Sequence, residues 1–320
     1  MRALVTGCAG FIGSHLTELL LEEGHSVVGI DCFNDNYGRA QKLRNLRHIG
    51  DWDAFEFVPV DLGRGDLAEL TADSNVVYHL AAEPGVRSSW GARYLNYVHN
   101  NVIATQHLLE ALKDRDDVRI VYSSSSSVYG DAEVRPTPEE APTHPLSPYG
   151  QTKLSAEHLC SLYRANFNVD AVSLRYFTVF GPRQRPDMAF HIFCRAALED
   201  RPITIFGDGR QSRDFTFVKD VVAATHAAGV AKLGDDRIFN VGGGAPASIR
   251  EVLDLIGEIS GRRLDVHYLE REHGDVRDTE ANTTRLREQL GFTPATTVEQ
   301  GVVAEFEWLA DALGSGSIGP

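Results

Sequence analysis

The residues Arg2-Ala3-Leu4-Val5-Thr6-Gly7-Cys8-Ala9-Gly10-Phe11-Ile12-Gly13 open the chain with a short apolar run and then three glycines spaced three residues apart. This pattern predicts a strand over residues 2–6, a glycine turn and a helix over residues 14–23. Glycines at such a turn permit tight bending and let backbone N–H groups approach a pyrophosphate at the start of the helix. The opening residues therefore predict a dinucleotide-binding β-α-β unit.

A second predicted strand, Ser26 to Ile30, ends at Asp31, which lies 18 residues after Gly13. A carboxylate at this place accepts hydrogen bonds from the hydroxyls of an adenosine ribose and repels a 2′-phosphate. Asp31 therefore predicts NAD rather than NADP as the cofactor.

Tyr149 and Lys153 form a second informative pair, because residues four apart lie on the same face of a helix. A neighbouring ammonium group stabilises a phenolate, so we expect the pKa of Tyr149 to be lowered and Tyr149 to act as a general acid or base. The serine run Ser123–Ser127 precedes this pair, and the Ser125 hydroxyl would share the proton. The spacing alone also fits an ordinary solvent-exposed helix turn.

A series of short motifs is spread along nearly the whole chain. They are Thr6-Gly7-x-x-Gly10-x-x-Gly13, Asp61-Leu62, His79-Leu80-Ala81-Ala82, Asn100-Asn101, Ser123-Ser124-Ser125, Tyr149-x-x-x-Lys153, Arg175-Tyr176-Phe177, Arg213-Asp214 and Gly274-Asp275-Val276. In this set and order the chain resembles the extended short-chain dehydrogenases/reductases of the nucleotide-sugar epimerase and dehydratase group. The joint occurrence of the motifs is more specific than any one of them.

Strand-like runs alternate with helical runs in the first half of the chain, which indicates a parallel sheet covered on both faces. The expected strands are residues 55–60, 76–80, 118–124, 169–176, 203–206, 238–241 and 264–268, and the expected helices are 65–72, 92–114, 149–166, 191–200, 249–260 and 298–311. The implied fold class is α/β, a Rossmann-type doubly wound parallel sheet with a smaller C-terminal α/β substrate-binding lobe. We expect an NAD-binding domain at residues 1–180, a nucleotide-sugar-binding lobe mainly at 181–313 and interleaved with the first, and a flexible tail at 314–320.

The resemblance also implies which residues contact the cofactor, the substrate and the reacting atoms. The residues expected to bind NAD are Gly7, Gly10, Phe11, Ile12, Gly13, Asp31, Asn34, Asp61, Leu62, Leu80, Ala81, Ala82, Asn100, Ser123, Tyr149, Lys153 and Tyr176. The residues expected to bind a UDP-sugar are Ser125, Ser126, Ser127, Thr178, Arg185, Ala189, Phe206, Arg213 and Asp275. Within that set, Arg213 and Asp275 would serve the diphosphate and ribose, and Ala189 and Phe206 the uracil. The expected catalytic residues are Tyr149, Lys153 and Ser125.

The two residues before Val128-Tyr129-Gly130 distinguish the reactions of this family. The family's dehydratases carry Asp-Glu there, and its UDP-glucuronate decarboxylases carry Glu directly before the motif. This chain has Ser126 and Ser127 instead. The chain therefore lacks the carboxylates that the dehydratases and decarboxylases of the family use. The resemblance implies instead an epimerase that inverts C4 through a transient 4-keto intermediate.

The segment from Tyr176 to Ala189 resembles the UDP-glucuronic acid 4-epimerases, as does Asn34-Asp35-x-Tyr37. Thr178 stands where UDP-glucose epimerases usually have Asn. A guanidinium matches a carboxylate in a bidentate pair, so Arg185 is the candidate contact for the carboxylate of UDP-glucuronic acid. The 4-keto form of that sugar is a β-keto acid prone to lose carbon dioxide, and a firm hold on the carboxylate would slow the loss. The implied product is UDP-galacturonic acid.

Several alternatives stay open. The substrate could instead be UDP-glucose or UDP-N-acetylglucosamine, in which case Thr178 and Arg185 would be incidental. Arg185 could also lie on the surface or pair with Asp187. A non-catalytic NAD-binding sensor is a further possibility, against which the intact catalytic residues argue. Many UDP-glucose epimerases have an arginine where this chain has Glu272, and whether Arg271 replaces it stays open.

Composition limits the partners and the compartment. A formal net charge of −14 argues against nucleic acid and anionic membranes. No apolar run approaches ~20 residues, and the four cysteines are scattered, so we expect a cytoplasmic protein with reduced thiols. The 12 histidines show no metal-ligand spacing, so no metal is expected. Apolar stripes such as Leu108-Leu109-Leu112 and Leu159-Leu162-Tyr163 indicate burial, and the resemblance implies that their helices pair in a homodimer.

Overall fold

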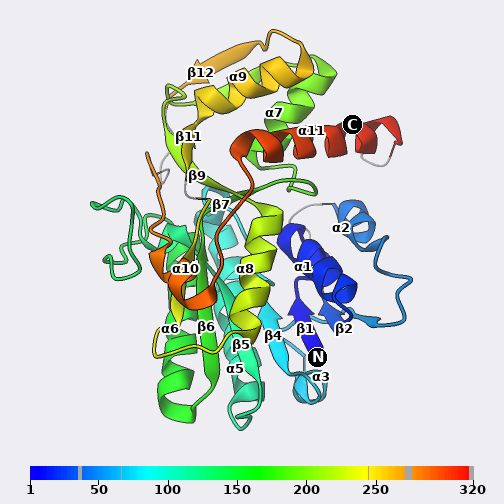
Figure 1. The fold of residues 1–320 in the computed structure, drawn as a ribbon, viewed down its shortest axis with the longest axis vertical. Coiled ribbons are helices and arrows are strands. Elements are labelled where there is room, and N and C mark those ends of the chain that lie inside the picture. Colours follow the sequence, from blue (N-terminus) through cyan, green and yellow to red (C-terminus); the bar gives the residue numbers. More distant parts are fainter. Residues whose placement is uncertain (35–37, 66, 244, 271–275, 317–320) are drawn as a thin grey trace.

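The centre of the molecule is a seven-stranded sheet in which every pair of neighbouring strands is parallel (Figure 1). The computed structural model describes residues 1–34, 38–65, 67–243, 245–270 and 276–316. The strands of this sheet are β1 Arg2–Thr6, β2 Ser26–Ile30, β3 Phe55–Val58, β4 Val76–His79, β5 Arg119–Ser125, β6 Asp170–Tyr176 and β10 Ile238–Val241. Their order is β10-β6-β5-β4-β1-β2-β3. The chain changes direction across the sheet between β1 and β4, and ligands of such sheets bind at this switch point, beyond the carboxyl ends of the strands.

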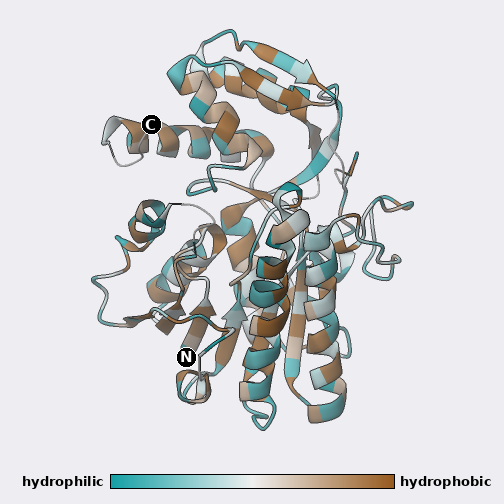
Figure 2. Ribbon diagram, turned by 180° about the vertical axis from the view of Figure 1, so that it is seen from behind, coloured by the Kyte–Doolittle hydropathy of each residue, from teal (hydrophilic) through white to brown (hydrophobic). Residues whose placement is uncertain are grey.

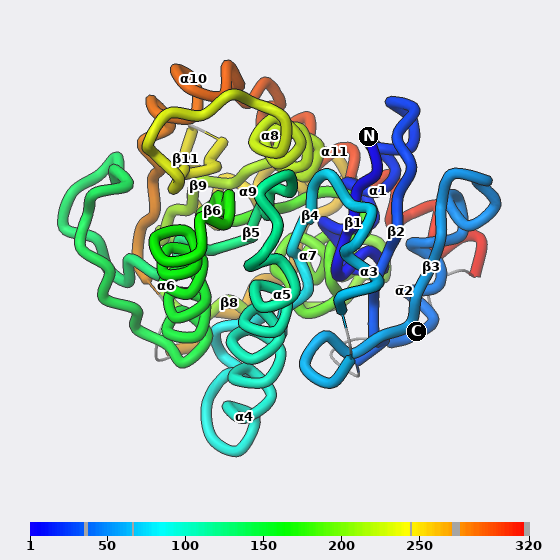
Figure 3. Tube along the Cα trace, turned by 90° about the horizontal axis from the view of Figure 1, so that it is seen from below, coloured from blue at the N-terminus to red at the C-terminus, as the bar shows by residue number. Residues whose placement is uncertain are grey.

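Helices cover both faces of the sheet, as the view from below in Figure 3 makes clear. On one face α1 (Phe11–Glu22) packs against α8 (Val218–Val230), and on the other α5 (Ala104–Leu112) packs against α6 (Pro148–Phe167). Leu16 of α1 and Leu108 of α5 are fully buried in the two corresponding apolar clusters. Figure 2 shows the apolar residues gathered in the strands between these helices. The sheet is therefore the middle of three layers.

A smaller α/β lobe occupies the upper part of Figure 1. Its elements are β7 Thr178–Phe180, β8 Ile203–Phe206, β9 Ser212–Phe217, β11 Pro246–Ser248, β12 Val266–Leu269, α7 Ala189–Glu199, α9 Ile249–Ser260 and α11 Val298–Gly314. The strands form two small sheets, ordered β11-β9-β7 and β12-β8. The other helices of the chain are α2 Arg39–Leu46, α3 Ala68–Thr71, α4 Tyr94–Tyr97 and α10 Thr284–Leu290, with short turns η1 Arg87–Ser89, η2 Gly91–Arg93, η3 Val98–Ile103 and η4 Ser126–Val128.

Helix α11 carries a buried carboxyl group that ties it to the chain leaving β7. The side chain of Glu305 is fully buried, and its Oε2 accepts a hydrogen bond from the backbone N–H of Gly181 at 2.8 Å. Burial raises the pKa of Glu305 well above its usual value, although this hydrogen bond acts in the opposite direction. The folded protein thus favours the protonated form of this carboxyl.

The predicted fold class is confirmed, with differences in detail. Helix α1 begins at Phe11 rather than residue 14, directly after the turn at Gly10. The single helix expected over residues 92–114 is interrupted by η3, a π-helical segment between α4 and α5. Strand β10 lies in the part of the sequence, residues 181–313, that was expected to form mainly the substrate-binding lobe. In the structure it pairs with β6 at the edge of the large sheet.

Several elements escaped prediction because their sequences lack a clear apolar period. The buried face of α2 consists of Gln41, Lys42, Asn45 and Leu46, which is mostly polar. Strands β7, β9 and β11 are short, and α8 follows β9 without an intervening turn. Helix α11 runs to Gly314, so the first residue of the expected tail is helical, whereas residues 317–320 lie outside the described chain. Among the helices of the described residues, none has the length and apolar character that crossing a bilayer requires.

Candidate active site

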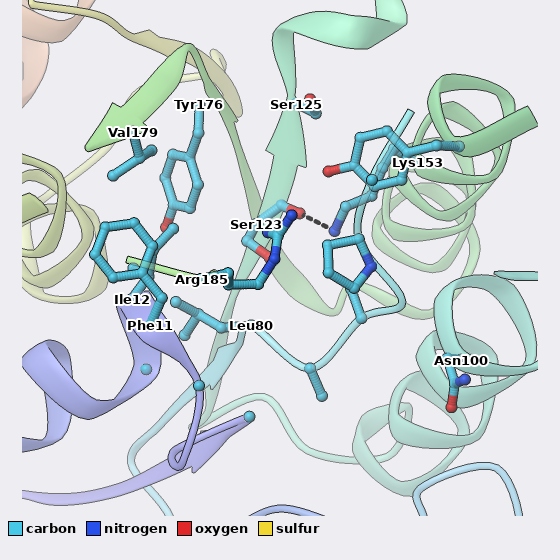
Figure 4. A pocket seen from close by; sticks show the side chains of 18 of the residues that line it. Phe11, Ile12, Leu80, Asn100, Ser123, Ser125, Lys153, Tyr176, Val179 and Arg185 are labelled. Carbon is cyan, nitrogen blue, oxygen red and sulfur yellow. Dashed lines mark hydrogen bonds between the residues drawn. The ribbon is translucent and has the colours of Figure 1, made fainter. Parts of the chain in front are cut away.

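A cavity opens at the switch point of the large sheet, at the carboxyl ends of its strands (Figure 4). Most of the predicted site residues line it. These are Gly7, Gly10, Phe11, Ile12, Gly13, Asp31, Asn34, Asp61, Leu62, Leu80, Ala81, Ala82, Asn100, Ser123, Ser125, Ser126, Ser127, Tyr149, Lys153, Tyr176, Thr178 and Arg185. They come from both halves of the sheet, so the fold gathers motifs that are far apart in the sequence.

The glycine turn between β1 and α1 packs so closely that side chains at Gly7 and Gly13 would clash with the backbone. Gly7 has a φ of +73°, and an added Cβ there would lie 2.9 Å from the backbone nitrogen of Ala81. An added Cβ at Gly13 would lie 2.1 Å from the carbonyl oxygen of Gly7. No side chain caps the N-terminus of α1, where Gly10 is the N-cap, so backbone N–H groups of its first turn are available to an anion. The turn therefore fits the pyrophosphate of a dinucleotide.

The end of β2 holds a buried carboxylate in a fixed orientation. Asp31 Oδ1 accepts hydrogen bonds from the backbone N–H of Phe33 at 2.8 Å and from Lys42 Nζ at 3.1 Å. Lys42 Nζ also donates to Asn34 Oδ1 at 2.7 Å. Lys42, which also lines the cavity, was not predicted, because the polar face of α2 gave no signal for a buried helix.

The far end of the cofactor region is held by the segment around η3. Asn100 lies in this π-helical segment and lines the cavity. The carboxylate of Asp61 accepts hydrogen bonds from the backbone N–H of Gly63 at 2.9 Å and from His99 Nε2 at 3.2 Å. Single-turn π segments are frequent at functional sites, because the extra residue changes the direction in which side chains leave the helix.

Tyr149, Ser125 and Lys153 meet where β5 ends and α6 begins. Ser147 caps α6 by accepting a hydrogen bond from the backbone N–H of Gly150 at 3.1 Å. An added Cβ at Gly150 would lie 2.5 Å from the carbonyl oxygen of Ser127, so only glycine lets α6 approach the serine run this closely. The Ser125 side chain lies close enough to the Tyr149 hydroxyl to lower the pKa of this phenol. Lys153 Nζ donates to the carbonyl oxygen of Ser123 at 2.6 Å (Figure 4).

The pKa of Tyr149 shifts in the direction opposite to the prediction. Burial raises the pKa of Tyr149, while the nearby Ser125 hydroxyl and the charge of Arg185 act to lower it. Burial also lowers the pKa of Lys153 to about 7. The expectation that Lys153 lowers the pKa of Tyr149 is therefore wrong for the protein alone. The sequence spacing identified the charge of Lys153 but not the burial of both side chains. Burial disfavours the charged form of each group, and it has the larger effect on both pKa values.

A buried ion pair holds α6 against the sheet behind these residues. Glu157 and Arg175 are both almost fully buried, and two N–H groups of Arg175 bond the two oxygens of Glu157 at 3.1 Å and 2.6 Å. Ser124 Oγ donates to Glu157 Oε2 at 2.6 Å, and Arg175 also donates to Tyr129 Oη at 2.8 Å. This network fixes α6, β5 and β6 relative to one another and so positions Tyr149 and Lys153.

The other end of the cavity is polar and carries one guanidinium. Ser126, Ser127, Thr178 and Arg185 line it together with Tyr149 and Lys153. Figure 4 shows Arg185 and Lys153 entering from different sides. Two N–H groups of Arg185 bond the Asp187 carboxylate at 3.0 Å and 2.9 Å, so the pairing left open by the sequence is present.

Some predicted substrate contacts do not line this cavity. Ala189 begins α7 just after Met188, which does line it. The guanidinium of Arg87 lies over the ring of Phe206 at 4.6 Å from its centroid. Arg213 donates to the backbone oxygens of Val276 and Arg277. The substrate contacts of Ala189, Phe206 and Arg213 stay predictions. The described residues do not include Asp35, Tyr37, Arg271, Glu272 and Asp275.

A family model described as the NAD dependent epimerase/dehydratase family matches residues 3–242. The chain belongs to this family. It is an NAD-dependent nucleotide-sugar epimerase, which agrees with the glycine turn and with Asp31 at the end of β2. The alternative of a non-catalytic NAD-binding sensor is not supported.

Individual relatives differ in the sugar that they are named for. The chain is 43% identical over 312 residues to an uncharacterized UDP-glucose epimerase of Bacillus subtilis (strain 168), covering 97% of this chain and 98% of the relative. It is 36% identical over 310 residues to a UDP-glucuronate 4-epimerase of Thermodesulfobacterium geofontis (strain OPF15), covering 95% of each chain. The crystal structure of UDP-glucuronic acid 4-epimerase from Bacillus cereus with UDP-glucuronic acid and NAD matches with a TM-score of 0.92 and 42% identity, covering 97% of this chain and 99% of that one.

Proposed function

We propose that this epimerase inverts C4 of UDP-glucuronic acid to give UDP-galacturonic acid. The observation that carries the proposal is the Arg185 guanidinium, which lines the same cavity as Tyr149 and Ser125. A positive, fork-shaped group beside the catalytic pair suits a sugar that bears a carboxylate close to the reacting carbon.

The residues of the chain supply proton transfer and orientation. The Tyr149 oxygen, with the Ser125 hydroxyl beside it, takes the proton of the sugar's 4-hydroxyl and later returns one to the 4-keto oxygen. Lys153 Nζ is fixed on the Ser123 carbonyl, and in its protonated form it would stabilise the phenolate that forms. Bound NAD supplies the reversible hydride acceptance at C4. The residues that would hold it are those of the glycine turn and Asp31.

The sugar carboxylate requires restraint while C4 is oxidised, because a β-keto acid loses carbon dioxide most readily when the breaking bond is perpendicular to the carbonyl plane. Arg185, Thr178 and the hydroxyls of Ser126 and Ser127 are the polar groups available to hold that bond near the plane. The absence of a carboxylate at positions 126 and 127 also avoids repulsion of the substrate's own charge. This arrangement favours inversion over decarboxylation.

The second candidate substrate is a neutral sugar, UDP-glucose or UDP-N-acetylglucosamine. One observation favours it: the Arg185 fork already bonds both oxygens of Asp187, so the guanidinium has a carboxylate without any substrate. The Bacillus subtilis relative named for UDP-glucose is also as similar in sequence as the Bacillus cereus epimerase.

Separate incubation of the purified protein with UDP-glucuronic acid and UDP-glucose, with the products resolved by NMR, distinguishes the two candidates. We expect UDP-galacturonic acid from the first and little or no UDP-galactose from the second. Conversion of UDP-glucose alone would replace the proposal by the neutral-sugar alternative.

We also propose that two copies of the chain pair through α4, η3 and α6. Leu108, Leu109 and Leu112 are buried within the chain, so the exposed apolar side chains of this region, Leu95 and Leu162, are the better candidates, with exposed fractions of 74% and 55%. Light scattering after gel filtration should give twice the 35.2 kDa of one chain. Leu162→Glu should reduce the mass to that of one chain, whereas Leu43→Glu, at a comparably exposed leucine on α2, should not.

A further inference from the structure

Three potential metal ligands meet at the edge of the sheet opposite the cavity. Glu23 follows the last turn of α1, His25 directly precedes β2, and His226 lies in the second half of α8. Helices α1 and α8 pack side by side on one face of the sheet (Figure 1). The chain therefore brings together one carboxylate and two imidazoles from elements that are far apart in the sequence.

The spacing of the ligand atoms suits a small tetrahedral cation. His226 Nε2 lies 3.0 Å from Glu23 Oε2, and His25 Nε2 lies 3.7 Å from the same oxygen. One ligand atom from each of the three residues lies within 4.8 Å of the others. Zinc–nitrogen and zinc–oxygen bonds of about 2.0–2.1 Å at tetrahedral angles place ligand atoms roughly 3.3 Å apart. Side-chain adjustments of a few tenths of an ångström to about 1.5 Å would therefore bring all three onto one ion.

The imidazole of His226 is already oriented as a metal ligand by the atom behind it. Its Nδ1 lies 3.1 Å from the hydroxyl oxygen of Tyr78, a fully buried residue of β4. An added Cβ at Gly229 would lie 2.3 Å from this hydroxyl, so glycine at that position in α8 is what admits it. With Nδ1–H donating to the Tyr78 oxygen, the lone pair of Nε2 faces Glu23. Metal-bound histidines are held in this way by a partner on the other ring nitrogen.

The second histidine also faces the carboxylate, and the cluster is open to solvent on one side. His25 Nδ1 lies 3.3 Å from the amino nitrogen of Met1, which leaves Nε2 facing Glu23. To bind a metal through Nε2, the His25 ring must carry its proton on Nδ1 and donate it to the neutral form of the Met1 amino group. The side chains of Glu23, His25 and His226 are 43%, 22% and 16% exposed, so an ion can enter and keep a water molecule as its fourth ligand.

We propose that Glu23, His25 and His226 bind one divalent transition-metal cation of the zinc type, which clips α1 to α8 at the end of the sheet remote from the cavity. Two imidazoles and one carboxylate with an open fourth position form a donor set that suits Zn²⁺ and excludes the hard cations Mg²⁺ and Ca²⁺, which prefer oxygen ligands. The expectation from sequence that no metal binds would then be wrong, because His25 and His226 are too distant in the chain for spacing to reveal them.

Titration of the chelator-treated, tag-free protein with Co²⁺ tests this site, because tetrahedral cobalt absorbs visible light intensely whereas octahedral cobalt does not. We expect one equivalent of Co²⁺ per chain, displaced by Zn²⁺, and at least a tenfold loss of affinity in His226→Ala and Glu23→Gln. Zn²⁺ at about 100 times its Kd should lower the apparent unfolding constant about 100-fold. His267→Ala removes a histidine that also pairs with a carboxylate, at 3.2 Å from Asp265, but that belongs to no cluster of three metal-binding side chains within the described residues, so it should leave the titration unchanged.

Two results of this titration would contradict the proposal. Absence of stoichiometric cobalt absorption, or undiminished binding in His226→Ala and Glu23→Gln, would mean that these residues form only hydrogen-bonded His–Glu pairs. If His226→Ala does not fold, His25→Gln provides the same comparison at the more exposed histidine, and undiminished Co²⁺ binding there would equally overturn the site.

Discussion

Replacing Arg185 by alanine tests the substrate assignment directly, because the two candidate sugars differ in the carboxylate that this residue would hold. Arg185→Ala should lower kcat/KM for UDP-glucuronic acid and leave any activity on UDP-glucose nearly unchanged. The size of the loss depends on the Asp187 contact, because the guanidinium must share or exchange its present partner when the substrate binds.

The structure sets bounds on that exchange. The side chain of Asp187 is 61% exposed and that of Arg185 17% exposed, so solvent screens the pair and its net contribution is about 0–1 kcal/mol. A hydrogen-bonded contact between the guanidinium and the substrate carboxylate inside the cavity is worth about 1.5–3 kcal/mol. The difference, about 0.5–3 kcal/mol, corresponds to a roughly 2- to 160-fold loss in kcat/KM.

The assay follows both sugars and a side product by NMR. In addition to the slower inversion, Arg185→Ala should release a decarboxylated UDP-pentose, because the carboxylate is no longer held near the carbonyl plane. Asp187→Asn is the matched variant: it keeps the guanidinium, frees it from its charged partner and should preserve or raise kcat/KM for UDP-glucuronic acid. Equal losses on both sugars in Arg185→Ala, with no pentose, would refute the carboxylate contact and assign Arg185 a structural role.

Further outcomes follow from other parts of the site and fold. Tyr149→Phe should lower turnover about 100-fold or more with little change in substrate affinity, since general acid–base catalysis contributes ~10²–10⁴-fold; near-normal turnover would remove Tyr149 from the mechanism. Denatured extracts of the purified protein should contain NAD, because the net reaction regenerates it, and Asp31→Ala should reduce that amount; a preference for NADP in the unmodified protein would contradict the role of Asp31. Glu305→Gln should raise the melting temperature more at pH 8 than at pH 5. The pKa of Glu305 is raised on folding, so as the pH rises the unfolded chain releases this proton before the folded protein does. The free energy of unfolding therefore falls as the pH rises above about 4.3. In Glu305→Gln this fall is absent, because glutamine does not titrate. Parallel melting curves at both pH values would show that Glu305 does not titrate in this way.

The sequence predicted the site best where function depends on the backbone and on residues close together in the chain. The glycine turn, Asp31 and the pair Tyr149 and Lys153 all lie at the cavity, because a strand, a tight turn and a helix leave little freedom in where these groups point. The parallel sheet followed from the alternation of strands and helices, since crossover connections require it.

The rest depended on tertiary environment, which spacing does not contain. Lys42 reaches Asp31 only because a polar helix packs beside the cofactor turn, and its sequence resembles a solvent-exposed helix. The pKa of Tyr149 moved upward because burial outweighed charge. The Arg175–Glu157 pair links residues 18 apart on a strand and a helix, and no local pattern predicts which buried charge meets which.

Strand β10 has a consequence for how the protein is made. β6 ends at Tyr176, but its outer neighbour begins only at Ile238, so during synthesis one edge of the growing sheet stays without a partner until the later strand emerges. At ~5–20 residues per second, that interval lasts several seconds, and an open strand edge is the part of a nascent chain most exposed to pairing with a neighbour. Val241 of β10 sits opposite Tyr176, a residue of the cavity wall. A ribosome-bound chain that stops before β10 therefore lacks the strand that pairs with this part of the cavity wall, and the wall gains that support only after the sixth strand has waited for residues 238–241.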